Sequence, residues 1–202
     1  MNKLLITAAL LAALGNAHAT SLVVNGSFEE QAQAEGSSSV YQALTGWTTL
    51  SGSGIELHNE GSGAASDGNN FVELDSAGNS AMAQTLATTA GALYTLSFDY
   101  APAAGVHTGS NGIQVRWNGD ALGTITANGA ALSGNDWHAH SFSVLGTGSD
   151  VLSFRAIGHG DGVGGSLDAI AVTAAVPEPS TWAMFAGGLV LIGFSLRRRS
   201  AR

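Results

Sequence analysis

Apolar and small polar residues alternate in short runs along most of the chain. In the run Ala92–Tyr100, aromatic and aliphatic side chains occupy every second position and polar side chains fill most of the positions between them. Side chains of an extended strand point alternately to its two faces, so this pattern predicts a strand with one buried and one solvent-facing side. Between the two ends of the chain, no window sustains the period of a helix.

Runs of this kind recur between glycine-rich and small polar segments, and they predict about ten short strands. We expect them near Ser21–Asn25, Gly46–Thr49, Gly54–His58, Asn70–Asp75, Ala81–Ala87, Ala92–Tyr100, Gly112–Trp117, Ala121–Ala127, Trp137–Leu145, Val151–Ile157 and Ser166–Thr173. Asn118-Gly119-Asp120 joins two of these runs, and Asn-Gly favours the positive φ angles of a tight hairpin turn. The pattern predicts an all-β fold, an antiparallel β-sandwich or jelly roll, and the lack of an internal repeat argues against a propeller.

The first 19 residues follow the pattern of a secretory signal peptide. Lys3 provides the positive start, Leu4–Leu14 the apolar run, and Ala17-His18-Ala19 the small-x-small site that signal peptidase cleaves. A buried N-terminal helix is the alternative. We therefore expect an exported domain over residues 20–175.

Residues 176–202 combine a proline-flanked glutamate, the apolar stretch Trp182–Leu196 and a cluster of arginines. The apolar stretch gives about 22 Å of helix, which is short for a bilayer core of about 30 Å. Arginines at its end favour a cytoplasmic C-terminus, which leaves the large domain outside. The residues that carry this pattern are Pro177, Glu178, Pro179, Arg197, Arg198 and Arg199.

This C-terminal segment resembles the PEP-CTERM sorting signal of Gram-negative bacteria. The resemblance implies a transient association with the inner membrane and cleavage by an exosortase near Pro177-Glu178-Pro179. It also implies delivery to the cell surface or to an exopolysaccharide matrix. A permanent single-span anchor over 182–196 is the alternative, because a short segment can still span a thinned bilayer.

Charge narrows the classes of partner. Between residues 20 and 176 the chain has 14 acidic residues, only Arg116 and Arg155 as basic residues, and no lysine. Nucleic acid is excluded as a partner, because phosphate binding needs a basic patch. A polysaccharide ligand is expected to be neutral or bridged by divalent ions, because an acidic polymer would be repelled. The chain has no cysteine, which excludes thiol catalysis and disulfide scaffolds.

A second resemblance covers most of the region from Leu22 to Val172. The motifs that carry it are Val24-Asn25-Gly26-Ser27-Phe28-Glu29, Gly46-Trp47, Tyr94-Thr95-Leu96-Ser97-Phe98-Asp99-Tyr100, Leu167-Asp168-Ala169-Ile170, and the glycine-rich segments Asp67–Asp75 and Asp161–Gly165. In this order and spacing they resemble a galactose-binding-like jelly roll, a fold shared by many carbohydrate-binding modules. The chain departs from the family at Ala169, where Asn is more common.

A buried carboxylate is expected at Asp168. This residue is in phase with Ile170 and Val172, which places it toward the apolar side of the last strand, and a buried carboxylate must be paired, hydrogen-bonded or bound to metal. The family resemblance implies a structural Ca²⁺ held by Glu29, Asp168 and the backbone carbonyl near Gly26, and calcium takes six to eight oxygen ligands. The alternative is that Asp168 accepts backbone N–H groups.

Two further clusters of polar side chains are candidates for chemistry. Glu73 and Asp75 share a strand face, as a glycosidase acid/base couple could, but a solvated face or a partner for Arg155 explains them more simply. His138 and His140 also share a face and could bind a transition metal with a third ligand, whereas solvent-facing histidines are more common. The sequence contains no Gly-x-Ser-x-Gly elbow, phosphate loop or nucleotide fingerprint.

Aromatic side chains are the usual stacking surface for sugars. Trp47, Tyr100 and Trp117 occupy positions that predict burial, which leaves Trp137 and Tyr41 as the candidate ligand contacts. The sequence therefore favours an exported, non-enzymatic jelly-roll domain that binds exopolysaccharide. The alternatives are a structural surface protein without a sugar site and a glycan-active hydrolase.

Overall fold

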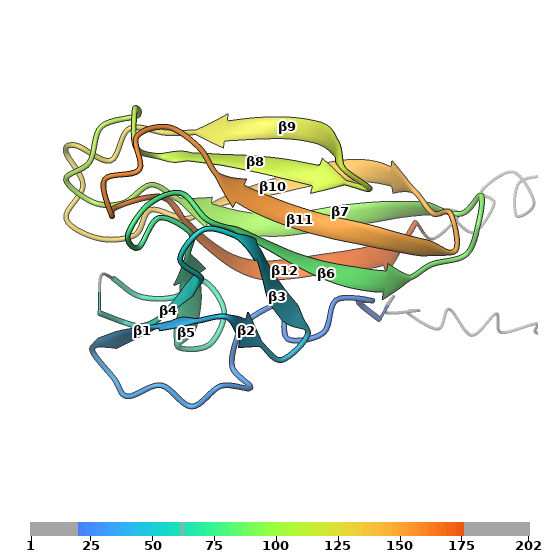
Figure 1. The fold of residues 1–202 in the computed structure, drawn as a ribbon, viewed down its shortest axis with the longest axis horizontal. Helices are drawn as coiled ribbons and strands as arrows, with labels where there is room; N and C mark the ends of the chain where they lie inside the picture. The colour runs from blue at the N-terminus through green and yellow to red at the C-terminus, as the bar shows by residue number, and fades with distance from the viewer. Residues whose placement is uncertain (1–19, 62, 176–202) are drawn as a thin grey trace, which may run out of the picture.

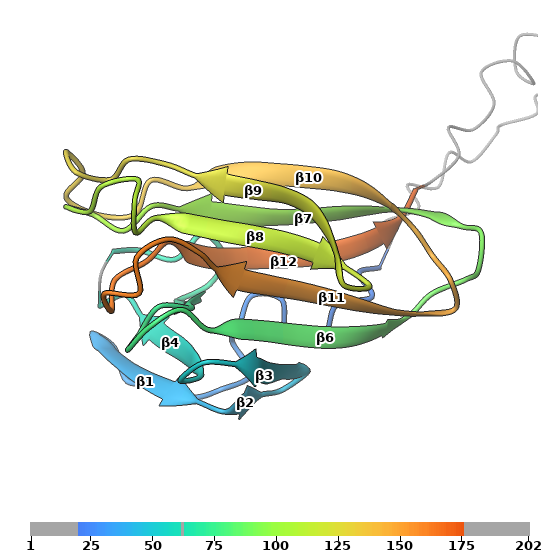
Figure 2. The same cartoon turned by 45° about the horizontal axis from the view of Figure 1, so that its top comes forward.

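The computed structural model describes residues 20–61 and 63–175, which form twelve strands in two antiparallel six-stranded sheets (Figure 1). The strands are β1 (Ser37–Tyr41), β2 (Ala43–Leu44), β3 (Trp47–Ser51), β4 (Ile55–Asn59), β5 (Asn70–Glu73), β6 (Ala81–Ala87), β7 (Leu93–Ala101), β8 (Gly112–Trp117), β9 (Asp120–Thr126), β10 (His138–Leu145), β11 (Ser149–Ala156) and β12 (Ser166–Ala174). The order in sheet A is β1-β4-β5-β12-β7-β10, and in sheet B it is β2-β3-β6-β11-β8-β9. The prediction of an all-β antiparallel sandwich is confirmed, and the two layers are clear in Figure 2.

The inner faces of the two sheets form one hydrophobic core. Phe98 of sheet A meets Phe154 of sheet B edge-on, with ring centroids 5.1 Å apart, and Trp47 lies 6.2 Å from Phe154 on the other side. Tyr100 and Trp117 are buried, as the alternating pattern predicts, and Trp47 is buried, as its motif position after Gly46 implies. All the strands and the core that the structure describes lie within residues 20–175, the range expected for the exported domain.

Most strand predictions are confirmed, β6 and β8 with the same bounds as expected. The hairpin at Asn118-Gly119 is confirmed as well, because both residues have positive φ, 52° and 88°. The expected strand Ser21–Asn25 is wrong. Its segment makes a single backbone bond to the last strand, from Leu22 N to Val172 O (2.8 Å), and Asn25 then turns to a φ of 54°.

Two strands, β1 and β2, were not expected from the sequence. β1 reads Ser-Ser-Ser-Val-Tyr and lies at the edge of sheet A, where it pairs only with β4. An edge strand of this kind does not need an alternating apolar face, because it contributes little to the core. Pattern analysis therefore could not detect it.

A β-bulge in β12 changes the orientation of Asp168. Asp168 pairs with Asp99 of β7, but the next regular pair is Ala171 with Ser97, and Ala169 between them has a φ of 50°. The extra residue breaks the alternation, so Asp168 lies on the outer face of sheet A while Ile170 lies in the core. The expectation that Asp168 shares a face with Ile170 is therefore wrong, although its side chain is buried.

The Val24–Glu29 motif anchors the N-terminal loop to the last strand. The carbonyl oxygen of Gly26 accepts a hydrogen bond from Ile170 N (3.0 Å), and Trp47 Nε1 donates to Asn25 O (3.1 Å). A Cβ at Gly26 would lie 1.9 Å from Ile170 O, so only glycine fits. Phe28 is fully buried although its φ is 61°, a strained angle for a bulky residue.

Several loops gather at the end of the sandwich opposite the two ends of the described chain (Figure 1). The β7–β8 loop bonds to the β9–β10 loop through Gly105 N and Gly129 O (2.8 Å), and to the β11–β12 loop through His159 N and Gly109 O (3.0 Å). No helix within residues 20–61 and 63–175 is long and apolar enough to cross a membrane. The predicted cleavage site at Ala17 and Ala19, the apolar stretch 182–196 and the sorting residues 177–179 and 197–199 lie outside the described residues.

Candidate functional site

Glu29 and Asp168 converge on one loop between β4 and β5. Glu29 Oε1 accepts hydrogen bonds from the N–H groups of Asn69 (2.8 Å) and Asn70 (2.6 Å). Asp168 Oδ2 accepts from the N–H groups of Ser66 and Asp67, at 2.8 Å each. Two carboxylates from opposite ends of the domain therefore hold the 66–70 loop against sheet A.

The surroundings of Asp168 bear on the predicted calcium site. Burial raises the pKa of Asp168 to about 7, against the opposing effect of the N–H groups of Asp67, Ala169 and Ser66. The oxygens of Asp168 accept hydrogen bonds from backbone N–H groups, which was the alternative to a calcium ion. The carbonyl oxygen of Gly26 accepts a hydrogen bond from Ile170 N. Within the described residues, no three His, Cys, Asp or Glu side chains are placed to hold a metal ion. This donor set fits calcium poorly, and calcium stays a prediction of the family resemblance.

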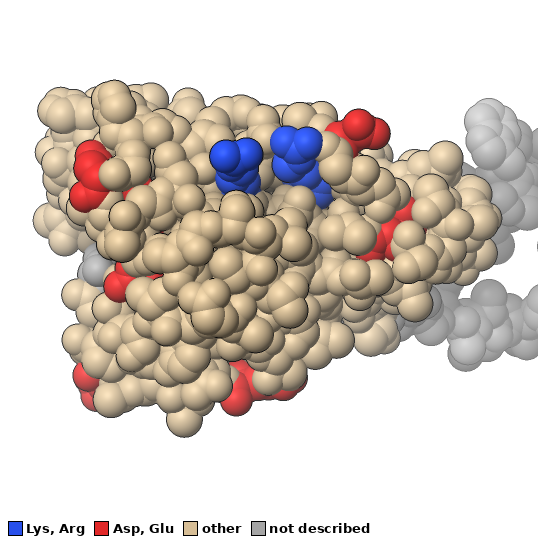
Figure 3. All heavy atoms as spheres, viewed as in Figure 1, with Lys and Arg blue, Asp and Glu red and all other residues tan. Residues whose placement is uncertain are grey.

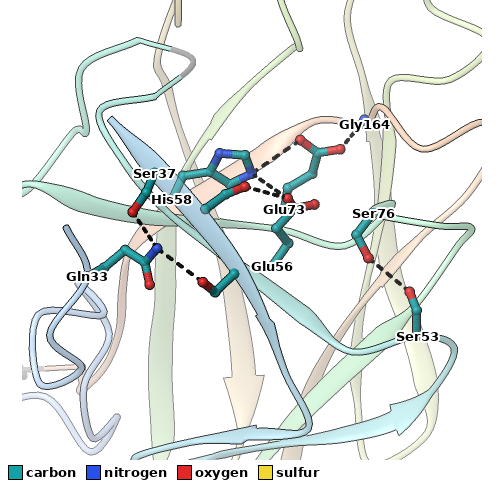
Figure 4. Close-up of polar contacts among 10 residues, drawn as sticks. Gln33, Ser37, Ser53, Glu56, His58, Glu73, Ser76 and Gly164 are labelled. Carbon is teal, nitrogen blue, oxygen red and sulfur yellow. Dashed lines mark hydrogen bonds and ion pairs between the residues drawn. The ribbon is translucent and has the colours of Figure 1, made fainter. Parts of the chain in front are cut away.

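The outer face of sheet A also carries a cluster of Glu56, His58 and Glu73, from β4 and β5 (Figure 4). His58 Nε2 lies 3.7 Å from Glu56 Oε1 and 3.8 Å from Glu73 Oε2. Glu73 Oε1 accepts a hydrogen bond from Gly164 N (2.5 Å), in the β11–β12 loop, which covers this carboxyl group. The buried Nε2 atom of His58 has no hydrogen-bond partner.

Burial keeps the His58–Glu73 contact neutral at neutral pH. It raises the pKa of Glu73 to about 8, against the Gly164 N–H and with help from the charges of Glu56, Asp75 and Asp161. Burial also lowers the pKa of His58, against the charge of Glu56. The two side chains are therefore a buried polar contact and not a strong ion pair.

The carboxylate couple considered for glycoside hydrolysis is not placed for that reaction. Glu73 and Asp75 are both buried, and Asp75 accepts a hydrogen bond from Asp161 N (3.3 Å) in the same covering loop. A glycosidase needs both carboxyl groups open to the sugar and to water. The suggested pairing with Arg155 is wrong, because Arg155 lies in β11 of sheet B, whereas Glu73 faces outward from sheet A.

Trp137 lies beside this cluster, immediately before β10. Its indole meets the ring of Phe71 edge-on, with centroids 5.7 Å apart, and Phe71 in turn stacks on His58 at 5.0 Å. Trp137 Nε1 donates to Ala64 O (2.9 Å) in the β4–β5 loop, and the side chain is half-buried. The ring is thus fixed in place at the loop end of the sandwich.

Tyr41 is not part of the same surface. It lies opposite Ile55 in the β1–β4 pair, three residues along β4 from His58. Its hydroxyl donates to Gln33 Oε1 (3.0 Å), and the ring is half-buried against the core. The two aromatic residues expected to contact a ligand are therefore not brought together.

A polar cavity of about 290 Å³ lies where β4 ends and β5 begins, and the β4–β5 loop contributes Glu60 and Asn69 to it. Its lining residues are all amides or carboxylates: Glu35, Asn59, Glu60 and Asn69. Sequence reasoning missed all four, because they come from two loops and one strand end. Only the fold brings them together.

The histidine pair on β10 does not form a metal site. His138 is exposed and lies 3.2 Å from Asp136 Oδ2, while His140 stacks on Phe98 with centroids 5.5 Å apart. Burial lowers the pKa of His140, and the charge of His138 lowers it further. The prediction of a solvent-facing side chain is confirmed for His138. It is not met by His140, which is half-buried against Phe98 of the core.

These features define a jelly-roll domain of the kind found in carbohydrate-binding modules. A family 16 carbohydrate binding module superposes with a TM-score of 0.51 at 15% identity, covering 75% of this chain and 99% of that module. The K1 cleaved adhesin domain of Lys-gingipain from Porphyromonas gingivalis superposes with a TM-score of 0.52 at 17% identity, covering 69% of this chain and 98% of that domain. At these identities the likeness establishes the fold.

The chain belongs to the family described as "Protein of unknown function (DUF642)", whose model matches residues 21–173. Residues 175–199 match the PEP-CTERM protein-sorting motif. A Multifunctional-autoprocessing repeats-in-toxin of Vibrio cholerae is 31% identical over 157 residues, which cover 77% of this chain. A toxin of the same description from Vibrio vulnificus is 31% identical over 152 residues. The chain spans 3% of the length of either toxin.

Proposed function

We propose that this protein is an exported, non-catalytic carbohydrate-binding protein that an exosortase system sorts to the cell surface or exopolysaccharide matrix. The observation that carries the binding role is the open cavity lined only by Glu35, Asn59, Glu60 and Asn69. Amide and carboxylate groups are the donors and acceptors that orient a sugar's hydroxyl groups. Trp137 is bonded to Ala64 O in the β4–β5 loop, the loop that contributes Glu60 and Asn69 to this cavity.

The sorting role rests on the order of elements at the C-terminus. The matched PEP-CTERM motif over residues 175–199 supports export and processing by an exosortase, and the Ala17-His18-Ala19 pattern supports cleavage by signal peptidase. A protein sorted this way associates briefly with the inner membrane of a Gram-negative cell. Replacing Pro177-Glu178-Pro179 with alanines is then expected to leave uncleaved protein in the inner-membrane fraction, and normal surface delivery of that variant would contradict the sorting role.

Glycan binding is tested on purified residues 20–175 with an array of neutral and acidic polysaccharides. The double variant E35A/N69A changes two exposed side chains of the cavity and is expected to lower affinity for the bound glycan at least tenfold without changing the melting temperature. The double variant T85A/E30A, which alters exposed side chains elsewhere, is the matched control. Failure to bind any glycan would instead favour a structural surface protein.

A further inference from the structure

The two basic residues of the domain lie side by side on the outer face of sheet B. Arg116 is on β8 and Arg155 on the neighbouring β11, where Arg116 pairs with Ser153 and Gln114 pairs with Arg155. This register makes the two arginines a diagonal cross-strand pair, with Cα atoms about 7 to 8 Å apart. Figure 3 shows the two basic side chains next to one another on this face.

Both arginines line a shallow hollow on this face. It has a volume of about 320 Å³, and Leu50, Ala81 and Ser153 are among the other residues that line it. Ser153 lies opposite Arg116 and Ala81 lies opposite Arg155 in the strand pairs, so each long arginine has a small side chain beside it. Leu50 is 58% exposed, so it offers an apolar surface beside the charged groups.

Both guanidinium groups have free donors. Arg116 is oriented by a bond from Nη1 to Gln114 Oε1 (2.8 Å) and by a bond from Nη2 to the carbonyl of Gly119. Across residues 20–61 and 63–175, every ion pair involves a histidine, so neither arginine pairs with a carboxylate there. Each guanidinium carries five N–H donors in a planar fork that matches a carboxylate.

We propose that this hollow, a shallow groove lined by Arg116, Arg155 and Leu50, binds the carboxylate groups of an acidic polysaccharide. The two arginines bind the carboxylates of uronate units, and Leu50 packs against part of a sugar ring. The proposal rests on the proposed carbohydrate function and names a ligand class for a second surface. The acidic remainder of the domain repels a polyanion, so such a polymer is accepted only at this groove. The acidic net charge predicts that an acidic polysaccharide needs a divalent ion as a bridge. On this face of sheet B the two arginines contact the carboxylate groups directly, so no bridging ion is needed.

The test compares matched polymers in the presence of EDTA, which removes divalent bridges. Binding of residues 20–175 to polygalacturonate and alginate is measured by affinity electrophoresis, with the carboxyl-reduced form of each polymer as the neutral partner. The wild-type domain is expected to bind the acidic form at least tenfold more tightly than the reduced form. This preference is expected to weaken as salt rises, because the groove is exposed.

Two variants identify the groove as the site. R116Q/R155Q is expected to lose at least tenfold in affinity for the acidic polymers, while R116K/R155K keeps the charge, loses the planar fork and retains part of the binding. Melting temperatures check that both variants are folded. Unchanged binding of the acidic polymers by R116Q/R155Q overturns the proposal.

The other outcomes separate this proposal from the proposed function. Binding of neutral glycans that E35A/N69A removes, together with no binding of acidic polymers, overturns the groove proposal and leaves the carbohydrate function intact. Absence of binding to every polymer, acidic and neutral, overturns both.

Discussion

The indole ring of Trp137 meets the ring of Phe71 edge-on, with centroids 5.7 Å apart and 75° between the ring planes. Phe71 is fully buried on the outer face of sheet A, and it stacks on His58. Through Phe71, Trp137 therefore packs next to the cluster of Glu56, His58 and Glu73 on this face. Trp137 has two roles: it stabilises the loop end of the sandwich, and it is the aromatic side chain proposed to lie near the ligand.

Substitution of Trp137 separates its ring contact from its hydrogen bond. W137F keeps an aromatic edge against Phe71 and loses the bond to Ala64 O, so the free energy of unfolding is expected to fall by about 1 kcal/mol. W137A loses both contacts and is expected to cost about 2 to 3 kcal/mol. Urea unfolding measures both values, and an equal cost for the two variants would show that the ring contact contributes nothing.

Glu73 makes the domain less stable as the pH rises. Its pKa is about 8 in the folded protein, against 4.5 for an ordinary glutamate carboxyl group, so the protonated form is favoured by folding. The stabilisation is complete below about pH 4.5 and is lost as the pH rises to about 8. Asp168, with a folded pKa of about 7, adds to the same slope, while the lowered pKa of His58 opposes it below pH 6.5.

E73Q removes this titration while its amide oxygen can still accept the Gly164 N–H. The variant is expected to match the wild type near pH 5 and to exceed its free energy of unfolding at pH 9 by about 2 to 4 kcal/mol. E30Q, at an exposed position, is the control and is expected to follow the wild-type curve. Parallel pH curves for E73Q and the wild type would contradict the assigned shift.

The bulge residue Ala169 is strained by its φ of 50°. A left-handed conformation costs an alanine about 1 to 2 kcal/mol, and Gly or Asn adopts it readily. A169G and A169N are therefore expected to raise the free energy of unfolding by about 0.5 to 1 kcal/mol. The same change at Ala171, two residues along β12 and outside the bulge, is expected to lower it.

This backbone angle would also account for the Asn that the family resemblance implies at that position. The preference follows from the conformation and does not require a ligand contact by the side chain. A drop in thermal stability for both A169G and A169N would remove this explanation.

Gly26 is required by the close approach of the N-terminal loop to β12. G26A places a Cβ 1.9 Å from Ile170 O and is expected to break the bond between Ile170 N and Gly26 O, at a cost of about 2 to 4 kcal/mol. G134A is the control, because a Cβ at Gly134 meets no atom within 4 Å. Equal melting temperatures for the two variants would rule out this packing role.

Chelation tests the predicted calcium ion. The N–H contacts of Asp168 and Glu29 already hold the 66–70 loop, so EDTA is expected to leave the melting temperature of residues 20–175 unchanged. A fall on chelation that added Ca²⁺ reverses in the wild type, and not in D168N, would support the calcium prediction instead.

The alternation of side chains was enough to predict part of the core. Tyr100 and Trp117 are buried as predicted, because the two-residue period of a strand is a local property of the chain. The targeting patterns at both ends and the absence of lysine between them were likewise readable without a fold. β1 escaped prediction because an edge strand carries no such period.

The sequence by itself determined the class of fold, the C-terminal sorting motif and the acidic character of the domain, since these depend on neighbouring residues or on composition. The tertiary structure decided where the polar groups meet. A single extra residue at Ala169 turned Asp168 to the outer face, where it holds a loop about 100 residues away along the chain. Strand pairing placed Arg116 beside Arg155 and gathered Glu35, Asn59, Glu60 and Asn69 around one cavity. Such groupings depend on register and loop packing between distant segments, and no local pattern records them.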